Sequence, residues 1–466
     1  MIEVTGIHTT KSGQKIFRNL NWRINDHEHW VISGPNGSGK TALLELLSGK
    51  AYIEKGAVHY DFITGKTWED QFQEKRRLIQ YIPALAMQSL LPAGGEMYYQ
   101  QRYYSIGDEA AAATVRVRDI LGRDHHHLRE LDIPSSFDLD PLLDREVKRL
   151  SNGQLKKVLI LQRLLHHIPR LLLMDYPFEG LDAASRKDLC HFIDLIATTY
   201  PVQIIIAGHG NELPRCMTHR LTLDALQIVR QEPVDQTITL SPPPRVVSTV
   251  ANGATAGEAV VDMRHLKIQY GETVVLEDFN WTVRRGDRWA IVGRNGSGKT
   301  TVFSLIFADH PMAYSEEVYL FGRRRGSGES IWDIKKRISY LGPELTSYLD
   351  PRAITGSARE FIASRHQQFD HQKLDTLLRF FEAETFIDRP VRYLSSGQLQ
   401  LALLMSCFMT TKELILLDEP FQFLCPRLRD RVNEFLQVYL RRDTTLILIT
   451  HYDEDVARWT EKTLRL

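Results

Sequence analysis

The sequence is poor in cysteine and has no long hydrophobic run. Its 466 residues include four cysteines, which are scattered and never form a C-x-x-C pair. Such usage is typical of reduced thiols in a cytosolic protein. No run approaches the roughly 18 apolar residues of a transmembrane helix, and the first residues lack the basic-then-apolar layout of a signal peptide. We therefore expect a cytoplasmic protein with no transmembrane segment, which would act at a membrane only through a separate partner chain.

The chain also lacks an excess of either charge. Lysine plus arginine (58) equals aspartate plus glutamate (58), so there is no strong nucleic-acid signal, although this balance is compatible with a local basic patch. Hydrophobic residues make up 43% and charged residues 25%, as in ordinary globular proteins. The length suffices for two large domains with full cores. Nothing in the sequence predicts whether two chains associate.

One glycine-rich segment occurs twice. The segment Gly34–Thr41 (G-P-N-G-S-G-K-T) recurs as Gly293–Thr300 (G-R-N-G-S-G-K-T), 259 positions later, and the same offset joins Trp22 to Trp281. A repeat of this length indicates a duplicated domain. Both segments match the P-loop, whose backbone N–H groups wrap phosphate oxygens while its lysine reaches the outer phosphates and its hydroxyl residue ligates Mg²⁺. The sequence therefore predicts two sites for a nucleoside triphosphate.

The candidate phosphate-binding residues follow from this match. They are Gly34, Asn36, Gly37, Ser38, Gly39, Lys40 and Thr41 in the first loop, and Gly293, Asn295, Gly296, Ser297, Gly298, Lys299, Thr300 and Thr301 in the second.

The remaining pattern predicts an α/β fold in two halves. We place the first half at residues 1–231, a linker at 232–258 and the second half at 259–466. The linker contains a triple proline and an Ala/Gly stretch, which favour extended and flexible chain. Each half has a polar region that looks helical, at about 95–150 and 345–393. Unbroken apolar runs elsewhere in each half are typical of strands buried on both faces of a parallel sheet.

An aspartate ends one buried strand in each half. Asp175 and Asp418 each follow a run of apolar residues. The carboxyl edge of such a sheet is where α/β proteins bind their ligands. We therefore expect both carboxylates to lie beside the phosphates, close to the P-loop hydroxyls of Thr41 and Thr300, which are candidate Mg²⁺ ligands.

A second motif narrows the class of P-loop protein. Leu150–Gln154 (L-S-N-G-Q) and Leu394–Gln398 (L-S-S-G-Q) each stand beside a helical segment. A serine and glycine amides at a helix start can bind an anion, although the serine alone could simply cap the helix. Both segments resemble the L-S-G-G-Q signature of ATP-binding-cassette (ABC) ATPases. This resemblance implies two cassettes, each with a helical subdomain, that meet face to face as an intramolecular dimer and hydrolyse ATP.

The resemblance also assigns roles to single residues. In this family the signature grips the γ-phosphate held by the opposite cassette, the aspartate holds Mg²⁺ through water, a glutamate orients the attacking water, a histidine contacts the γ-phosphate, an aromatic ring stacks on adenine and the D-loop carries an aspartate. The matching positions are Ser151, Gly153, Gln154, Ser395, Gly397 and Gln398 for the signature, Asp175 and Asp418 for the Mg²⁺ aspartate, Glu419 for the glutamate, His209 and His451 for the histidine, Tyr270 for the aromatic ring and Asp182 for the D-loop. The implied catalytic residues are Glu419, His451 and Lys299.

Departures from the family pattern fall mainly on one composite site. The site built on the first P-loop receives Tyr176 in place of the glutamate, Lys11 in place of the aromatic ring and Cys425 in place of the D-loop aspartate. The other site has only the unusual Glu344, where the family has a glutamine; the first half has Ala84 there. We therefore predict one hydrolytic site and one site that binds ATP and turns it over slowly or not at all. We interpret Glu179, three residues after Tyr176, as a surface or hinge residue; the alternative is that it partly substitutes for the missing glutamate.

A closer resemblance lies in the second half. The segment Leu320–Lys336, with His310-Pro311 before it, resembles ModF-type twin-cassette ATPases, whose name comes from an association with molybdate-transport genes. It implies a soluble motor for an anion transporter whose permease is a separate chain. Such a motor is either free in the cytoplasm or peripheral at the inner face of the cell membrane. A ribosome-associated ABC protein is a rival, although such chains carry a long charged linker. A regulatory or repair switch is a third interpretation.

Three further clusters have more ordinary interpretations. Arg323-Arg324-Arg325 is either a solvated turn or a docking point for an anionic partner. Tyr98-Tyr99 and Tyr103-Tyr104 are packing residues or part of an interface. His125-His126-His127 lacks the spacing of a metal site.

Overall fold

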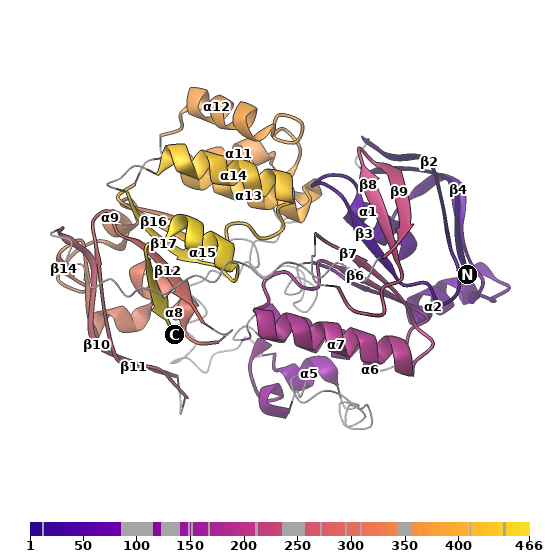
Figure 1. Cartoon of the computed structure of the whole chain (residues 1–466), viewed down its shortest axis with the longest axis horizontal. Helices are drawn as coiled ribbons and strands as arrows, with labels where there is room; N and C mark the ends of the chain where they lie inside the picture. Colours follow the sequence, from indigo (N-terminus) through magenta and orange to yellow (C-terminus); the bar gives the residue numbers. More distant parts are fainter. Residues whose placement is uncertain are drawn as a thin grey trace.

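The protein is described from a computed structural model of the whole chain (Figure 1). The structure describes residues 1–11, 14–84, 115–122, 140–147, 150, 152–165, 168–209, 213–234, 257–270, 273–293, 296–307, 310–342, 354, 356–366, 368–410, 412–440 and 444–466. Several predicted residues lie outside these ranges, namely Tyr98, Tyr99, Tyr103, Tyr104, His125, His126, His127, Ser151, Asn295 and Glu344. The side chains of Lys11 and Tyr270 are also outside the description.

The first half follows the predicted order of strands and helices. Its elements are β1 (Ile2–Lys11), β2 (Gln14–Ile24), β3 (Trp30–Ser33), α1 (Lys40–Leu47), β4 (Ile53–Tyr60), α2 (Trp68–Leu78), β5 (Ile79–Ile82), α5 (Val117–Leu121), η3 (Asp140–Leu142), α6 (Asn152–Leu165), β6 (Leu171–Asp175), α7 (Ala183–Thr199), β7 (Gln203–Ala207), β8 (His219–Asp224) and β9 (Gln227–Pro233).

The second half repeats this order. Its elements are β10 (Ala259–Tyr270), β11 (Thr273–Arg284), β12 (Arg288–Val292), α8 (Lys299–Ile306), η5 (Pro311–Tyr314), β13 (Glu317–Leu320), β14 (Arg323–Arg324), α9 (Ile331–Lys335), β15 (Ile338–Leu341), α11 (Ala358–Ser364), α12 (His371–Phe381), η6 (Val391–Tyr393), α13 (Ser396–Phe408), β16 (Leu414–Asp418), α14 (Pro426–Tyr439), β17 (Thr445–Ile449), α15 (Asp453–Trp459) and β18 (Lys462–Arg465).

A mainly parallel sheet forms the centre of each half. The strand orders are β5-β6-β7-β3-β8-β9 and β15-β16-β17-β12-β18, and only the β8–β9 pair is antiparallel. Every residue of β6, β7, β16 and β17 is buried, as their unbroken apolar sequences predict. Because these strands are parallel, both P-loops and both strand-end aspartates lie at the carboxyl edges of their sheets. The predicted α/β fold is confirmed.

A smaller antiparallel sheet lies beside each parallel sheet. The strand orders are β2-β1-β4 and β11-β10-β13-β14. A tryptophan pair links the two sheets of each half: the rings of Trp22 and Trp30 lie 5.2 Å apart at 85°, and those of Trp281 and Trp289 lie 5.5 Å apart at 90°. These edge-to-face pairs are a favourable aromatic geometry. The duplication seen in the sequence therefore extends to side-chain packing.

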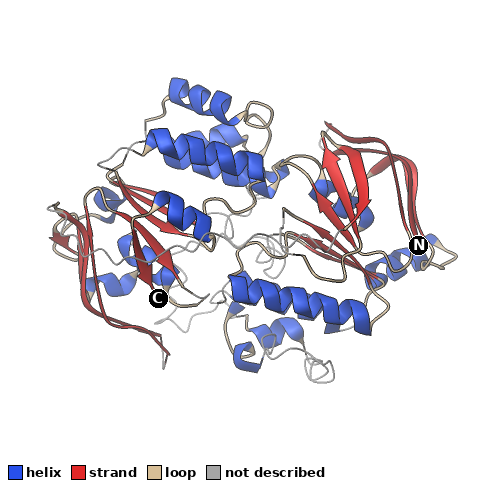
Figure 2. Ribbon diagram, in the orientation of Figure 1, coloured by secondary structure: helices blue, strands red, loops and turns tan. Residues whose placement is uncertain are grey.

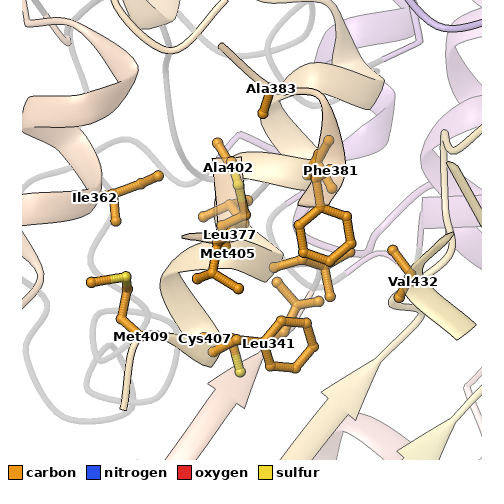
Figure 3. Packing of buried hydrophobic residues seen from close by; sticks show 14 of the residues in the cluster. Leu341, Ile362, Leu377, Phe381, Ala383, Ala402, Met405, Cys407, Met409 and Val432 are labelled. Atoms are coloured by element: carbon orange, nitrogen blue, oxygen red, sulfur yellow. The ribbon is translucent and has the colours of Figure 1, made fainter. Parts of the chain in front are cut away.

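A helical layer completes each half (Figure 2). In the second half, α11, α12, α13 and α14 enclose an apolar core in which Leu377, Phe381, Ala402 and Met405 lie close together (Figure 3). Asp370 caps α12 by accepting a hydrogen bond from the Lys373 N–H at 3.0 Å. In the described parts of the chain, no helix combines the length and apolar character needed to cross a membrane.

The two halves lie head to tail, so that α13 of the second half approaches the α1 region of the first (Figure 1). Strand β9 runs to Pro233 and β10 begins at Ala259. Most of the predicted linker, residues 235–256, lies outside the described residues. The limits 1–231, 232–258 and 259–466 therefore stay predictions, with β9 extending two residues past the first of them.

Candidate nucleotide-binding sites

The two P-loops have the same local geometry. Gly39 and Gly298 stand at the starts of α1 and α8 with φ of 99° and 95°, which side-chain-bearing residues rarely adopt. The next residue in each half is the P-loop lysine. The Lys40 ammonium donates to the carbonyls of Gly34 (2.7 Å) and Pro35 (2.8 Å). The Lys299 ammonium donates to the Gly293 carbonyl at 2.7 Å.

Both loops hold polar groups that fit a phosphate. Burial lowers the pKa of Lys40 to about 8 and also lowers the pKa of Lys299. The hydroxyl oxygens of Ser38 and Ser297 are buried and have no hydrogen-bond partner among the residues that the structure describes. An anion in each loop would satisfy these hydroxyls and stabilise the charged lysines. The donor set of both P-loops therefore suits triphosphate binding.

The candidate Mg²⁺ ligands of the first half lie side by side. The Thr41 hydroxyl donates to Asp175 Oδ2 at 2.9 Å, while Asp175 Oδ1 is buried and finds no hydrogen-bond partner in the described part of the chain. Burial raises the pKa of Asp175 to about 7. A cation would compensate this buried carboxylate, so the pair fits Mg²⁺, the remaining ligands coming from phosphate and water. Asp418 is likewise buried at the end of β16, and Thr300 lies in the first turn of α8.

Tyr176 and Glu419 take the same place after β6 and β16. Both have a left-handed backbone, with φ of 48° and 49°. The Tyr176 hydroxyl lies 3.0 Å from Nε2 of His209. Glu419 Oε1 lies 3.4 Å from Nε2 of His451. The two halves therefore offer a phenol–imidazole pair and a carboxylate–imidazole pair at equivalent points.

Burial dominates the electrostatics of these pairs. It lowers the pKa of His209 to about 3 and that of His451 to about 4, so both imidazoles are neutral at pH 7. Burial, reinforced by the charge of Asp418, raises the pKa of Glu419 well above its ordinary value. A carboxylate with a raised pKa is a stronger base, and the tyrosine has no comparable capacity at neutral pH.

The first P-loop meets the second half directly. Asn36 Nδ2 donates to the Phe423 carbonyl at 2.8 Å, and the Cys425 N–H donates to Asn36 Oδ1 at 2.7 Å. A Cβ atom on Gly397 would lie 1.5 Å from Asn36 Nδ2, so only glycine fits there. Ser395 caps α13 in a capping box with Gln398. The serine is therefore a helix cap, and its motif also faces the opposite P-loop.

Residues of the first half reach the second site as well. Asp182 caps α7 by accepting from the Ser185 N–H at 2.7 Å. Its charge also acts on Lys299 and His451, opposing the effect of burial on their pKa values. Helix α6 begins within the first signature and includes Gly153 and Gln154. Tyr270 is the last residue of β10, and its backbone pairs with Thr273.

Two segments of the chain, residues 17–179 and 276–422, match the family described as ABC transporter. The chain belongs to this family. A similar curated protein is the ABC transporter ATP-binding protein ModF of Escherichia coli (strain K12), which is 30% identical over 93% of this chain and 90% of its own length. An uncharacterised ABC transporter ATP-binding protein of Schizosaccharomyces pombe is 26% identical over 95% of this chain and 92% of its own. The predicted resemblance to ModF-type proteins is confirmed.

Solved structures of ABC proteins share the fold. A structure of ribosome-bound archaeal Pelota and ABCE1 matches with a TM-score of 0.60 and 19% identity, covering 98% of this chain and 76% of that chain. An archaeal ribosome recycling factor, in complex with a ribosomal stalk protein, matches with a TM-score of 0.54 and 18% identity, covering 98% and 86%. Both matches span the two cassettes, so the tandem ABC architecture is confirmed.

The structure contradicts two expectations for this ABC chain, a surface position for Glu179 and full exposure of the arginine triplet. Glu179 is a half-buried contact between the cassettes, because its carboxylate accepts a long hydrogen bond (3.5 Å) from the Phe423 N–H. Arg325 is 2% exposed, pairs with Glu329 at 2.5 Å and donates to the Tyr314 hydroxyl at 3.1 Å. Only the first two arginines of the predicted patch are therefore at the surface, in β14.

Sequence reasoning also missed one functional pair of the cassettes. Lys156 is buried in α6, and its ammonium donates to the backbone carbonyls of Tyr176 (2.9 Å) and two nearby residues. Gln400 in α13 donates to the carbonyls of Glu419 and Pro420 at 3.3 and 3.1 Å. Both residues stand five positions after the signature serine, which is the signal that could have identified them. They fix the backbone that carries Tyr176 and Glu419.

Proposed function

We propose that this ABC protein is an asymmetric ATPase, with hydrolysis confined to the site built on the second P-loop. The observation that carries this proposal is the exchange of Glu419 for Tyr176 at one backbone position. Glu419 lies beside His451 in a setting that raises its pKa. Tyr176 lies beside His209 with no carboxylate in the pair. A water molecule at the second site would meet a carboxylate able to accept its proton, whereas one at the first would meet a phenol.

The hydrolytic site would combine groups from both cassettes. Lys299 and the loop Gly293–Thr301 would hold the β- and γ-phosphates of ATP, and Gly153 and Gln154 would complete the site from the other cassette. Mg²⁺ held by Thr300 and Asp418 would neutralise phosphate charge when bound. His451 would contact the γ-phosphate, and Tyr270 would stack on adenine. The charge of Asp182 on Lys299 and His451 supports this composition.

The site built on the first P-loop would bind a nucleotide and keep it bound. Lys40, Thr41, Asp175 and His209 would bind Mg-ATP, with Ser395, Gly397 and Gln398 supplied by the second cassette. The bonds from Asn36 to the Phe423 and Cys425 backbone support a stable contact at this site. Slow or absent turnover here would keep the cassettes joined while the second site opens and closes.

The ATPase assignment has a direct test. Substituting Glu419→Gln should abolish steady-state ATP hydrolysis, because the amide cannot accept a proton from water. Substituting Tyr176→Phe should leave the rate within about twofold, since it removes a hydroxyl from the non-hydrolytic site. Both variants should still bind two nucleotides per chain. Substantial turnover in the Glu419 variant, or its loss in the Tyr176 variant, would overturn the asymmetry.

For the physiological role, we propose a cytoplasmic motor that works with a membrane permease on a separate chain in the transport of an anion such as molybdate. The extensive similarity to the ABC transporter ATP-binding protein ModF supports this role. A permease-independent role in translation is the second candidate, favoured by the fold shared with a ribosome-bound protein. Native membranes and ribosomes should be tested for capture by the Glu419→Gln protein loaded with ATP. Recovery of a permease favours transport, whereas recovery of ribosomal subunits favours translation.

A further inference from the structure

A cavity of about 780 Å³ lies in the first half, between α2, the start of β5 and α6. Its lining is almost entirely charged and amide side chains. Gln80, the second residue of β5, marks its position near the amino end of that strand. The P-loop and Asp175 lie at the opposite, carboxyl edge of the same parallel sheet. The cavity is therefore separate from both candidate nucleotide sites.

The acidic side chains of this cavity are already satisfied by the protein. Glu74 accepts hydrogen bonds from the backbone N–H groups of Thr64 (2.8 Å) and Gly65 (3.0 Å), and these bonds lower its pKa. Asp70 closes the capping box of α2 with Thr67. Both carboxylates therefore have local backbone partners.

The basic side chains of this cavity have fewer hydrogen-bond and ion-pair partners than its carboxylates. Arg163, on α6, has a buried Nε atom without a hydrogen-bond partner, and burial lowers the pKa of its guanidinium. Arg76 contacts the Phe72 ring at 5.9 Å, and Arg77 lies close enough to Glu74 to lower the pKa of that carboxyl group. Among the described residues, no carboxylate forms an ion pair within 4.0 Å with any of these three arginines.

Leaving the buried Nε of this cationic side chain without a partner is costly, because arginine keeps its charge at all ordinary pH values. A bound anion would remove that cost. We propose that this cavity is a binding site for a small soluble ligand carrying two phosphate groups. Each phosphate group carries about −1.5 to −2 charges and offers oxygen pairs that match the guanidinium fork. The three arginines of the lining outnumber its two carboxylates, so the net charge of the cavity favours an anion, and the volume lies in the range of small-molecule sites.

Inorganic pyrophosphate is the probe for the test. It is titrated calorimetrically into the full chain with both P-loops saturated by a non-hydrolysable ATP analogue and Mg²⁺. Wild type should bind one further equivalent, and Arg163→Gln should lose at least tenfold in affinity for it. Arg77→Gln, at the exposed rim, should weaken binding as well. Arg145→Gln, an exposed arginine of the same half that does not line the cavity, is the matched control and should bind like wild type.

Thermal unfolding without ligand separates a binding role from a structural one. Because the buried Nε of the half-buried Arg163 has no hydrogen-bond partner among the described residues, Arg163→Gln should melt no lower than wild type. If Arg163→Gln melts lower and also loses binding, the result for Arg77→Gln decides between the two roles. Weaker pyrophosphate binding by Arg77→Gln supports the site, and unchanged binding by that variant overturns it. Absence of a further equivalent in wild type, or full binding by Arg163→Gln, also overturns the proposal. None of these readouts depends on ATP hydrolysis.

Discussion

Tyr176 and Glu419 share one backbone conformation but not one chemistry. Each N–H donates to the last residue of the neighbouring strand, Tyr176 to the Ala207 carbonyl at 2.8 Å and Glu419 to the Ile449 carbonyl at 2.9 Å. The duplicated fold has therefore kept a left-handed turn that costs energy for any residue with a side chain. What differs is the group that the turn presents to the histidine. The tyrosine has a structural partner of its own and is an integral part of the first site.

This partnership predicts a stability effect without an activity effect. Tyr176→Phe removes the hydroxyl from His209 and leaves a buried imidazole nitrogen without its partner, which should cost about 1–3 kcal/mol. The thermal midpoint of the first cassette should fall, as measured by calorimetry. Tyr52→Phe, which removes a hydroxyl from a side chain that is 73% exposed, is the control and should melt like wild type. An unchanged midpoint in Tyr176→Phe would show that the pair carries little energy.

The Asn36 amide predicts how the two cassettes stay together. Asn36→Ala removes both hydrogen bonds to the second half, and each is worth about 0.5–1.5 kcal/mol. Hydrogen exchange at the Cys425 amide should therefore accelerate by about one order of magnitude. Residues 177–182, the equivalent loop of the first half, are an internal control whose exchange should change little. Equal acceleration in both loops would indicate general destabilisation instead.

The buried Arg325 predicts a strong contrast within one triplet of arginines. Arg325→Gln leaves Glu329 buried and without its charge partner, so the second cassette should lose about 3–5 kcal/mol of stability. Arg324→Gln, at an exposed position of β14, should change stability by less than about 0.5 kcal/mol. Urea unfolding of both variants would measure the difference. Similar values for the two substitutions would mean that the Arg325–Glu329 pair contributes little.

Local motifs predicted much of the candidate sites because their function depends on local backbone geometry. The P-loop of the first half forms its expected glycine turn, and Asp175 ends a buried strand beside Thr41. The signature segment 394–398 also meets the opposite P-loop, as the family resemblance implied. The first two outcomes depend on short spacings that the sequence displays directly, whereas the third depends on the family resemblance.

Long-range packing decided what the sequence could not show. The sequence does not distinguish the three consecutive arginines. In the fold, Arg325 forms an ion pair with Glu329 and lies over the Tyr314 ring. The sequence around Glu179 indicates only a loop. Its hydrogen bond from the Phe423 N–H depends on the packing of the second cassette against the first. The equivalent positions 156 and 400 carry a lysine in the first half and a glutamine in the second. This difference in residue type concealed the role that the two side chains share.

Lys156 gives the sharpest prediction of pH dependence. Burial lowers its pKa to about 8 in the folded chain, from an ordinary value of 10.5. Between about pH 8 and pH 10.5, Lys156 binds more protons in the unfolded chain than in the folded chain. This group therefore makes the free energy of unfolding rise with pH across that window. A difference of two and a half pKa units corresponds to about 3 kcal/mol. Below pH 8 the cost of the buried charge is present in full.

Lys156→Gln should remove this rise, because glutamine does not titrate and Gln400 shows that an amide can hold the same loop. The wild type should therefore gain up to about 3 kcal/mol relative to the variant between pH 7 and pH 10. Urea unfolding at both pH values measures this gain, and effects of other titrating groups cancel in the comparison. Lys187→Gln, at an exposed position of α7, should follow wild type at both pH values. Parallel behaviour of wild type and Lys156→Gln would mean that the Lys156 ammonium is stabilised by its carbonyl partners enough to offset burial.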